Sequence, residues 1–197
     1  MKSIVRKDSG EDWKQYLTRL MKEAGLIEDN DDPPNDETLR KFDKSRKDKQ
    51  VSNDEWTSPT DPDARIAKMK DGTTHLAYKA EHVVDLGTNA ILAAEIYHAN
   101  YQDTQTLEDS LHQAQINLVE AGSEAEIVEA AADKGYHSNG TITELREHTT
   151  YRTYIPEPEL KHDRVWTDKP PEQKAAVYAN RRRTRGGRRR AACRAAR

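Results

Sequence analysis

A single aspartate stands at the end of a short apolar run in the second half of the chain. Residues 127–133 read IVEAAAD, and Lys134-Gly135-Tyr136 follow directly. A short, nearly unbroken apolar run of this kind is typical of a strand in the middle of a covered sheet. A carboxylate at its end costs free energy unless it is solvated, paired or bound to a metal. Asp133 is therefore the first candidate for chemistry, and such a hard ligand suits Mg²⁺.

A lone aspartate at a strand end is a weak signal by itself. Metal-dependent phosphoryl transfer uses two ions about 3.5–4 Å apart, which several carboxylates from different elements must hold. A helix cap or an ion pair would explain Asp133 equally well. The sequence has no glycine-rich phosphate loop, no nucleophile elbow and no cysteine pair with metal spacing.

Positive charge is concentrated at the C-terminal end. Residues 181–197, the arginine-rich tail, contain nine arginines and no acid, so the remaining 180 residues carry 23 basic and 35 acidic side chains, a balance of −12. A basic tail on an acidic body suggests a polyanionic partner. Charge alone leaves open the alternative that the tail is a disordered end without a target.

Composition limits the class of protein. A length of 197 residues suits one domain, or one domain with a subdomain, and 34% charged against 6% aromatic residues predicts a modest core. No apolar run approaches the roughly 20 residues of a membrane span, and no secretory signal begins the chain. The single cysteine, Cys193, fits a reducing compartment. We therefore expect a cytoplasmic protein without a membrane partner.

Hydrophobic periodicity predicts helices first and a sheet later. Residues 9–25 form the clearest helix, with a capping box from Ser9 to Asp12 and a stop at Gly25. A second, polar helix is expected within residues 36–50, and 51–63 read as loop.

The pattern then changes to alternation. Residues 74–85 and 90–99 alternate around a short turn and predict an antiparallel hairpin, with Leu76, Tyr78, Ala80 and Val84 sharing one face. The expected order afterwards is a helix over 103–122, a strand ending at Asp133, a helix capped near Ser138, a strand over 150–158 and a helix from Pro171. This order indicates an α/β fold, a mixed sheet with helices on it.

Five blocks of the sequence resemble the DDE transposases of bacterial insertion sequences, whose catalytic core has the ribonuclease H fold. The resemblance covers nearly the whole chain, to about residue 190, and even the opening residues look like the insertion that follows the first core strand in that family. The blocks are DPDARIAKMKDGTTHLAYKAEHVVDLGTNAILA (61–93), HANYQDTQTL (98–107), ADKGYHSNGTITELREH (132–148), YRTYIPEPE (151–159) and AVYANRRRTRGGRRR (176–190).

The resemblance assigns Asp133 a role as the second aspartate of the catalytic triad. In that family three carboxylates hold two Mg²⁺ or Mn²⁺ ions, which activate a water or a DNA 3′ hydroxyl and stabilise the leaving oxygen. The implied partners are transposon-end and target DNA, and full-length transposase subunits. The arginine-rich tail would contact DNA phosphates, through Arg181, Arg182, Arg183, Arg185, Arg188, Arg189 and Arg190.

The resemblance also predicts what this chain lacks. The family's first aspartate precedes the stretch matching the start of this chain, and its final glutamate lies beyond the arginine run, where this chain reads AACRAAR. The expected fold is therefore a ribonuclease H-like mixed sheet with flanking helices, lacking the first core strand and the last core helix. The expected domains are a helical insertion and linker (1–58), a partial core (59–165), and a C-terminal helix with the tail (166–197).

Other acids have ordinary explanations. Asp85 lies at the hairpin tip, where turn chemistry explains it, and Asp103 is placed to cap the helix that follows. We therefore expect the chain alone to be inactive. The remaining acids lie in a loop or on a solvent-facing helix: Asp61, Asp63, Glu144 and Glu147.

Three further expectations follow. The tail resembles a coding region read in a shifted frame, as in a decayed insertion element. The alternative function is a non-catalytic regulator that binds DNA or transposase subunits through the tail; a small active nuclease ranks last.

Because the family's first strand is central in its sheet, its neighbours here would expose unpaired backbone groups, which predicts marginal stability or aggregation.

Overall fold

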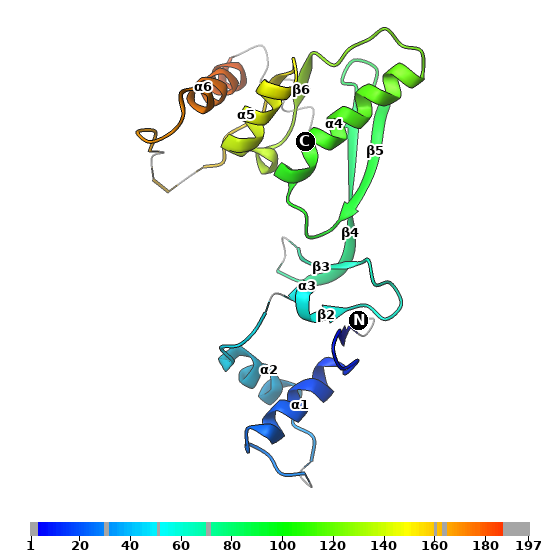
Figure 1. The fold of residues 1–197 in the computed structure, drawn as a ribbon, viewed down its shortest axis with the longest axis vertical. Helices are drawn as coiled ribbons and strands as arrows, with labels where there is room; N and C mark the ends of the chain where they lie inside the picture. The colour runs from blue at the N-terminus through cyan, green and yellow to red at the C-terminus, as the bar shows by residue number, and fades with distance from the viewer. Residues whose placement is uncertain are drawn as a thin grey trace. The chain divides into compact units, whose positions relative to one another are not determined.

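The computed structural model describes residues 4–29, 32–50, 52–69, 72–159, 161–162 and 165–186. The chain forms two compact units: unit 1 comprises Met1–Tyr78 with His98–Asn100, and unit 2 comprises Lys79–Tyr97 with Tyr101–Arg197. Figure 1 shows the helices and strands of each unit.

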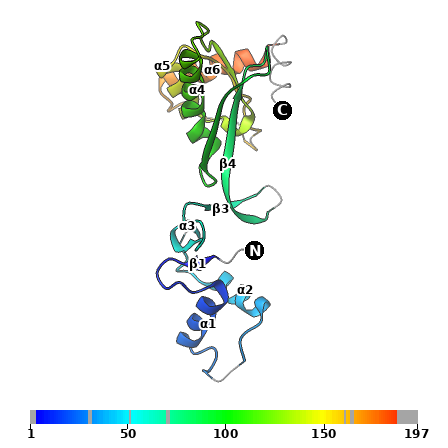
Figure 2. The same ribbon diagram turned by 90° about the vertical axis from the view of Figure 1, so that its right-hand side faces the viewer.

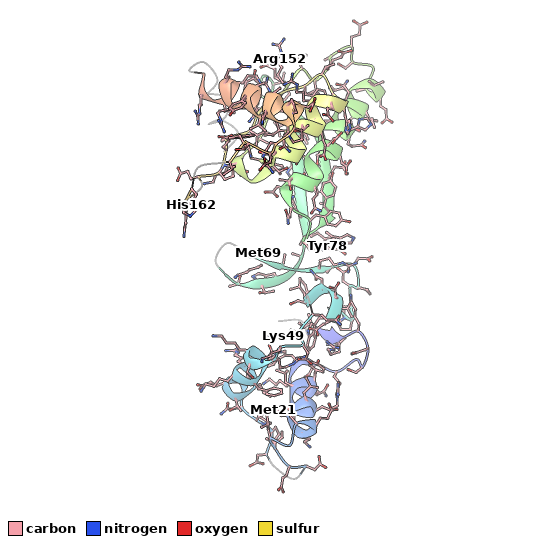
Figure 3. All side chains as sticks on the ribbon, turned by 60° about the vertical axis from the view of Figure 1, so that its left-hand side comes forward. Met21, Lys49, Met69, Tyr78, Arg152 and His162 are labelled. Atoms are coloured by element: carbon pink, nitrogen blue, oxygen red, sulfur yellow. The ribbon has the colours of Figure 1, made fainter. Side chains whose placement is uncertain are left out.

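Unit 1 is built around two helices, α1 (Trp13–Glu23) and α2 (Asp36–Ser45). Helix α1 ends before Gly25, which has a positive φ of 66°, a conformation that glycine adopts without steric cost. The expected capping box at Ser9 is wrong: Asp12 is the N-cap and forms the box with Gln15. The buried cluster of this unit consists of Tyr16, Leu17, Met21 and Leu39, of which Figure 3 labels Met21.

The region expected to be loop between residues 51 and 63 holds two short elements. Helix α3 spans Ser52–Glu55 and strand β2 spans Trp56–Thr57, which pairs with β1 (Val5–Arg6) in an antiparallel ladder. Strand β3 (Arg65–Lys68), also unforeseen, pairs with the first residues of the next strand. These elements are too short for a periodic sequence signal, because two to four residues contain at most two repeats of a strand or about one turn of a helix.

The predicted hairpin is present as β4 (Thr74–Val84) and β5 (Ile91–His98), in a sheet of order β3-β4-β5. At its tip the carboxylate of Asp85 accepts hydrogen bonds from the backbone N–H and the hydroxyl of Thr88, at 2.8 and 2.6 Å. Turn chemistry is therefore the role of Asp85, as expected.

The buried face of the hairpin is opposite to the face that carries the apolar residues. Tyr78 is 44% exposed and Val84 is 38% exposed, although both belong to the apolar set of β4. The other face carries Glu81, which is only 7% exposed, and Ala93 of β5, which is 3% exposed. Helix α4 lies beside the hairpin in Figures 1 and 2. It covers this second face, because its Thr106 and Ser110 donate to Glu81. Alternation therefore predicted the strands and left the choice of buried face open.

The rest of unit 2 follows the predicted order. Strand β6 pairs in parallel with β7, with Ala130 opposite Thr153, and α5 packs against both α6 and β7. Ser138 caps α5 as expected, since its hydroxyl oxygen accepts the backbone N–H of Thr141 at 2.9 Å. The elements are α4 (Asp103–Glu120), β6 (Glu129–Ala131), the 3-10 turn η1 (Lys134–Tyr136), α5 (Asn139–His148), β7 (Arg152–Tyr154) and α6 (Pro171–Arg185).

One core holds these helices and strands together. It joins α4, α5, α6, β6 and Ile155, the residue that follows β7. In it, Leu145, Ile142 and Val177 are 0–1% exposed. At its edge the buried amide of Asn180 accepts the backbone N–H of Ile155 at 3.0 Å and donates to its carbonyl at 2.8 Å. The architecture is a mixed α/β fold with antiparallel and parallel sheets, as the sequence predicts at this level.

Candidate functional site

Asp133 lies directly before η1 and two residues after β6, which ends at Ala131 and not at Asp133 as expected. Its side chain is at the surface, and its Oδ1 accepts the backbone N–H of Gly135 at 2.6 Å. Asp133 is therefore the N-cap of η1. The cap role that the sequence left open for Asp133 is therefore confirmed for its Oδ1. The hydrogen bond from Gly135 holds the carboxylate in a defined orientation.

A second carboxylate, that of Asp103, approaches the same turn. A Cβ atom placed on Gly135 would lie 2.6 Å from Asp103 Oδ2 and 2.9 Å from Asp133 Oδ1, so both carboxylates crowd the space that the glycine leaves free. The expected cap role of Asp103 is wrong. Gln102 is the N-cap of α4, and Asp103 instead forms an ion pair with Lys79 at 2.7 Å.

Beside these acids lies a buried polar cluster centred on Glu81, which we call the Glu81 network. The carboxylate of Glu81 accepts the hydroxyls of Thr106 at 2.6 Å, Ser110 at 2.8 Å and Tyr136 at 3.1 Å. It also forms an ion pair with the ammonium group of Lys79 at 2.6 Å. Four donors thus surround a carboxylate that is almost inaccessible to water.

The network fixes the protonation state of its members. Burial alone favours the neutral form of Glu81, but the bonds from Lys79, Thr106 and Ser110 outweigh it and lower the pKa of the carboxyl. Burial likewise opposes the charge on Lys79, yet its bonds with Asp103 and Glu81 raise its pKa. Burial, then the charges of Glu81 and Asp103, raise the pKa of the Tyr136 hydroxyl. Lys79 and Glu81 are therefore charged, and Tyr136 neutral, near pH 7.

This network was not predicted from the sequence. Its signal is a Lys-x-Glu pair on one face of a strand, combined with hydroxyl residues four apart on the following helix, Thr106 and Ser110. Spacings of two in a strand and four in a helix each place side chains on one face. Only the packing of α4 on the hairpin shows that the two faces meet.

The network forms one wall of a cavity of about 1060 Å³. Residues 81–86 of the hairpin line one side and residues 125–133 line the other, with Leu107, Leu111 and Leu118 of α4 between them. Glu81, Asp133 and Tyr136 all face this cavity. Among the described strands, β4 and β6 are not hydrogen-bonded to each other, since they belong to separate sheets.

The described residues do not form a complete metal centre. In the parts of the chain that the structure describes, no three histidine, cysteine or acidic side chains gather where they could hold an ion. The oxygens of Glu81 already bond to four donors, and one oxygen of Asp103 is already engaged in the ion pair with Lys79. The residues present therefore do not fit a two-ion centre on their own.

The arginines predicted to bind DNA divide into three groups. Arg181 makes a bidentate pair with Glu157 at 2.8–3.1 Å, and Arg183 donates to the carbonyl and hydroxyl of Thr153 at 2.9 and 3.1 Å. Arg182 and Arg185 are exposed on α6, and neither has an ion pair among the described residues. Arg188, Arg189 and Arg190 lie outside the described residues.

The fold and site together define a mixed α/β domain that presents a carboxylate just after a strand of its parallel pair. The chain belongs to the transposase DDE domain family, whose family model matches residues 35–185. Members of this family act in DNA transposition and generally use divalent metal ions.

No curated protein and no solved structure matches the chain. In the described part of the chain, no helix has the length and apolar character needed to cross a membrane.

Proposed function

We propose that this chain forms part of the catalytic domain of an insertion-sequence DDE transposase and that Asp133 is one of its metal-binding carboxylates. The observation that carries the proposal is the position of Asp133, exposed at the end of β6 and held by Gly135 at the cavity wall. Family membership supplies the reaction class, transfer of DNA strands with divalent metal ions.

We further propose that the core is ribonuclease H-like. An antiparallel hairpin followed by a helix, and a parallel strand pair with a helix between its strands, support this. The cavity between β4 and β6 is the place for a strand that would join the two sheets, because β3 pairs only with residues 74–77 of β4 and, among the described strands, β6 pairs only with β7. The division into residues 1–58, 59–165 and 166–197, and the cytoplasmic location, remain proposals.

The chain alone is proposed to be inactive in strand transfer. Two metal ions need several converging carboxylates, and the residues that the structure describes bring only Asp103 near Asp133. What Asp133 retains is the capacity to act as a single weak ligand for Mg²⁺ or Mn²⁺.

A paramagnetic titration tests the role of Asp133. We expect millimolar Mn²⁺ to broaden the backbone NMR signals of Gly135 and its neighbours, and Asp133→Asn to abolish this. Asp85→Asn, which removes a carboxylate at the hairpin tip, is the matched control and leaves the broadening at Gly135 unchanged. Broadening at Gly135 that persists in Asp133→Asn, or none in the native chain, contradicts the assignment.

A plasmid-nicking assay with Mg²⁺ or Mn²⁺ should show no activity of the native chain.

A second candidate function is a non-catalytic regulator that binds DNA or transposase subunits. The observation that favours it is the exposure of Arg182 and Arg185 on α6 without ion pairs among the described residues. For duplex DNA, each neutralised phosphate contributes about −0.9 to the slope of log affinity against log salt. Binding that is independent of salt would count against this function.

A further inference from the structure

Four arginines from three elements lie on one face of unit 2. Arg146 is in the last turn of α5, Arg152 is in β7, and Arg182 and Arg183 are in α6. These elements pack against one another through the core of unit 2. Figure 3 labels Arg152 at this face.

A pocket of about 290 Å³ marks the centre of this face. Arg146, Arg182 and Arg183 line it, together with Tyr151 and Thr153. Arg183 is held in place, because its guanidinium donates to the carbonyl and the hydroxyl of Thr153. The pocket therefore has one fixed cation at its wall and two exposed cations at its rim.

The positive charge of this face is largely uncompensated. Arg146 and Arg182 have no ion pair among the described residues, and Arg152 has only Glu129 at 3.8 Å, an exposed and weak pair. Burial, then repulsion from the charges of Arg146, Arg152 and Arg182, lowers the pKa of the Arg183 guanidinium. Like charges held together in this way are stabilised by an anion that binds among them.

We propose that Arg146, Arg152, Arg182 and Arg183 form a binding surface for the phosphate backbone of duplex DNA. Guanidinium groups donate in a planar fork that matches phosphate oxygens, and their spread over three elements suits successive phosphates of a polymer better than one small anion. The surface includes two of the arginines assigned to the tail and adds Arg146 and Arg152, which the sequence analysis did not select. The proposal rests on the proposed function in that DNA is the polyanion.

The test is binding of the full chain to a fluorescein-labelled 20-base-pair duplex of arbitrary sequence, measured by anisotropy across a salt series. Arg146→Gln combined with Arg182→Gln removes two cations that have no partner within the described residues, so the fold should survive. We expect about tenfold or greater weakening at 0.1 M salt, and a salt slope that is shallower by about 1.8, or 0.9 for each lost contact.

The matched control is Arg40→Gln combined with Lys44→Gln on α2, which removes the same charge from an exposed helix of unit 1. It should change the affinity less than threefold and leave the slope unchanged, because screening limits the reach of a surface charge to about 10 Å. If both double variants weaken DNA binding equally, only the net charge of the chain matters, and the proposed binding surface is wrong.

The remaining outcomes separate this surface from the wider function. If the native chain binds DNA and the Arg146/Arg182 variant binds equally well, the surface is wrong and DNA binding by another part of the chain stands. If the native chain does not bind the duplex at 0.05 M salt, both the surface and the DNA-binding part of the proposed function are wrong. Competition by polyglutamate as effective as unlabelled DNA would assign the surface to acidic protein instead and overturn the DNA assignment.

Discussion

At the scale of single residues, Glu81 is the side chain with the most demanding environment in unit 2. A charged carboxylate at 7% exposure is stable only because four donors replace the water it has lost. One of these donors, Tyr136, belongs to the turn that follows Asp133, and Lys79 also binds Asp103. The network thus connects β4 and α4 to the turn that orients Asp133.

Substitution of Glu81 by Gln should destabilise the chain by about 2–3 kcal/mol at pH 7, since Lys79 and three hydroxyls lose a charged acceptor. The folded pKa of Glu81 is lowered, so its contribution is present above the ordinary carboxyl pKa and is lost as pH falls through the folded value. The difference between native chain and variant should therefore shrink as the pH falls below about 4.5, the ordinary glutamate pKa.

Urea unfolding at several pH values measures this difference. Glu124→Gln, in an exposed segment, is the control and should have an effect near zero. An equal loss of stability for Glu81→Gln at pH 3 and pH 7 would mean that the charge of Glu81 contributes nothing.

Gly135 allows a second test at the same scale. A methyl group there would lie 2.6 Å from Asp103 Oδ2 and 2.9 Å from Asp133 Oδ1, so Gly135→Ala should displace both carboxylates and cost about 1 kcal/mol. Gly140→Ala, where the new atom is at 3.7 Å or more from its neighbours within helix α5, should stabilise by about 0.5–1 kcal/mol. Thermal melts of both variants measure the two effects. A change in melting temperature of the same sign for Gly135→Ala and Gly140→Ala would contradict the crowding at Gly135.

At the scale of elements, the helices of unit 2 are held by side chains that act on backbone groups. Asn180 of α6 is 0% exposed, and its side-chain amide hydrogen-bonds both the N–H and the carbonyl of Ile155, just beyond β7. The end of β7 has no further ladder partner for these groups among the described strands. The amide therefore replaces a strand at this point and joins α6 to the parallel sheet.

Asn180→Leu should cost about 2–4 kcal/mol, because it leaves two buried backbone groups unpaired while keeping side-chain volume. Glu172→Gln, exposed in the first turn of the same helix, is a control for helix α6 and should cost less than about 0.5 kcal/mol. Chemical denaturation measures the free energy of unfolding of both variants. A cost below about 1 kcal/mol for Asn180→Leu would mean that water hydrogen-bonds the backbone groups of Ile155 in the variant.

At the scale of the whole molecule, the described residues form two hydrophobic cores, one in each unit. One surrounds Leu17 in unit 1 and the other surrounds Leu145 in unit 2, and both leucines are 0% exposed. Among the described strands, β4 has no partner beyond Ala77 on the edge that β3 occupies, and β6 has only β7. Val128 at the cavity is 52% exposed. Unpaired edges favour association with other chains, so the expectation of marginal stability or aggregation remains. A sharp cooperative melt with monomeric elution would contradict it.

Two core substitutions should separate the units. Leu17→Ala should cost about 2–5 kcal/mol and speed amide hydrogen exchange in α1 and α2, while α5 keeps its protection. Leu145→Ala should speed amide hydrogen exchange in α5, while α1 and α2 keep their protection. Equal acceleration in all three helices by either variant would show that the two units unfold as one.

The sequence by itself determined the order of most elements, the cap at Ser138, the turn at Asp85 and the place of Asp133 at a strand end. All of these depend on local spacing, since periodicity and capping act within a few residues. Tertiary structure alone decided that Glu81 is buried while Tyr78 and Val84 are exposed, and that Asp103 lies beside Gly135. It also brought Arg146 and Arg152 to the arginines of α6. These results depend on which faces pack together, and residues far apart in sequence meet only when the core forms.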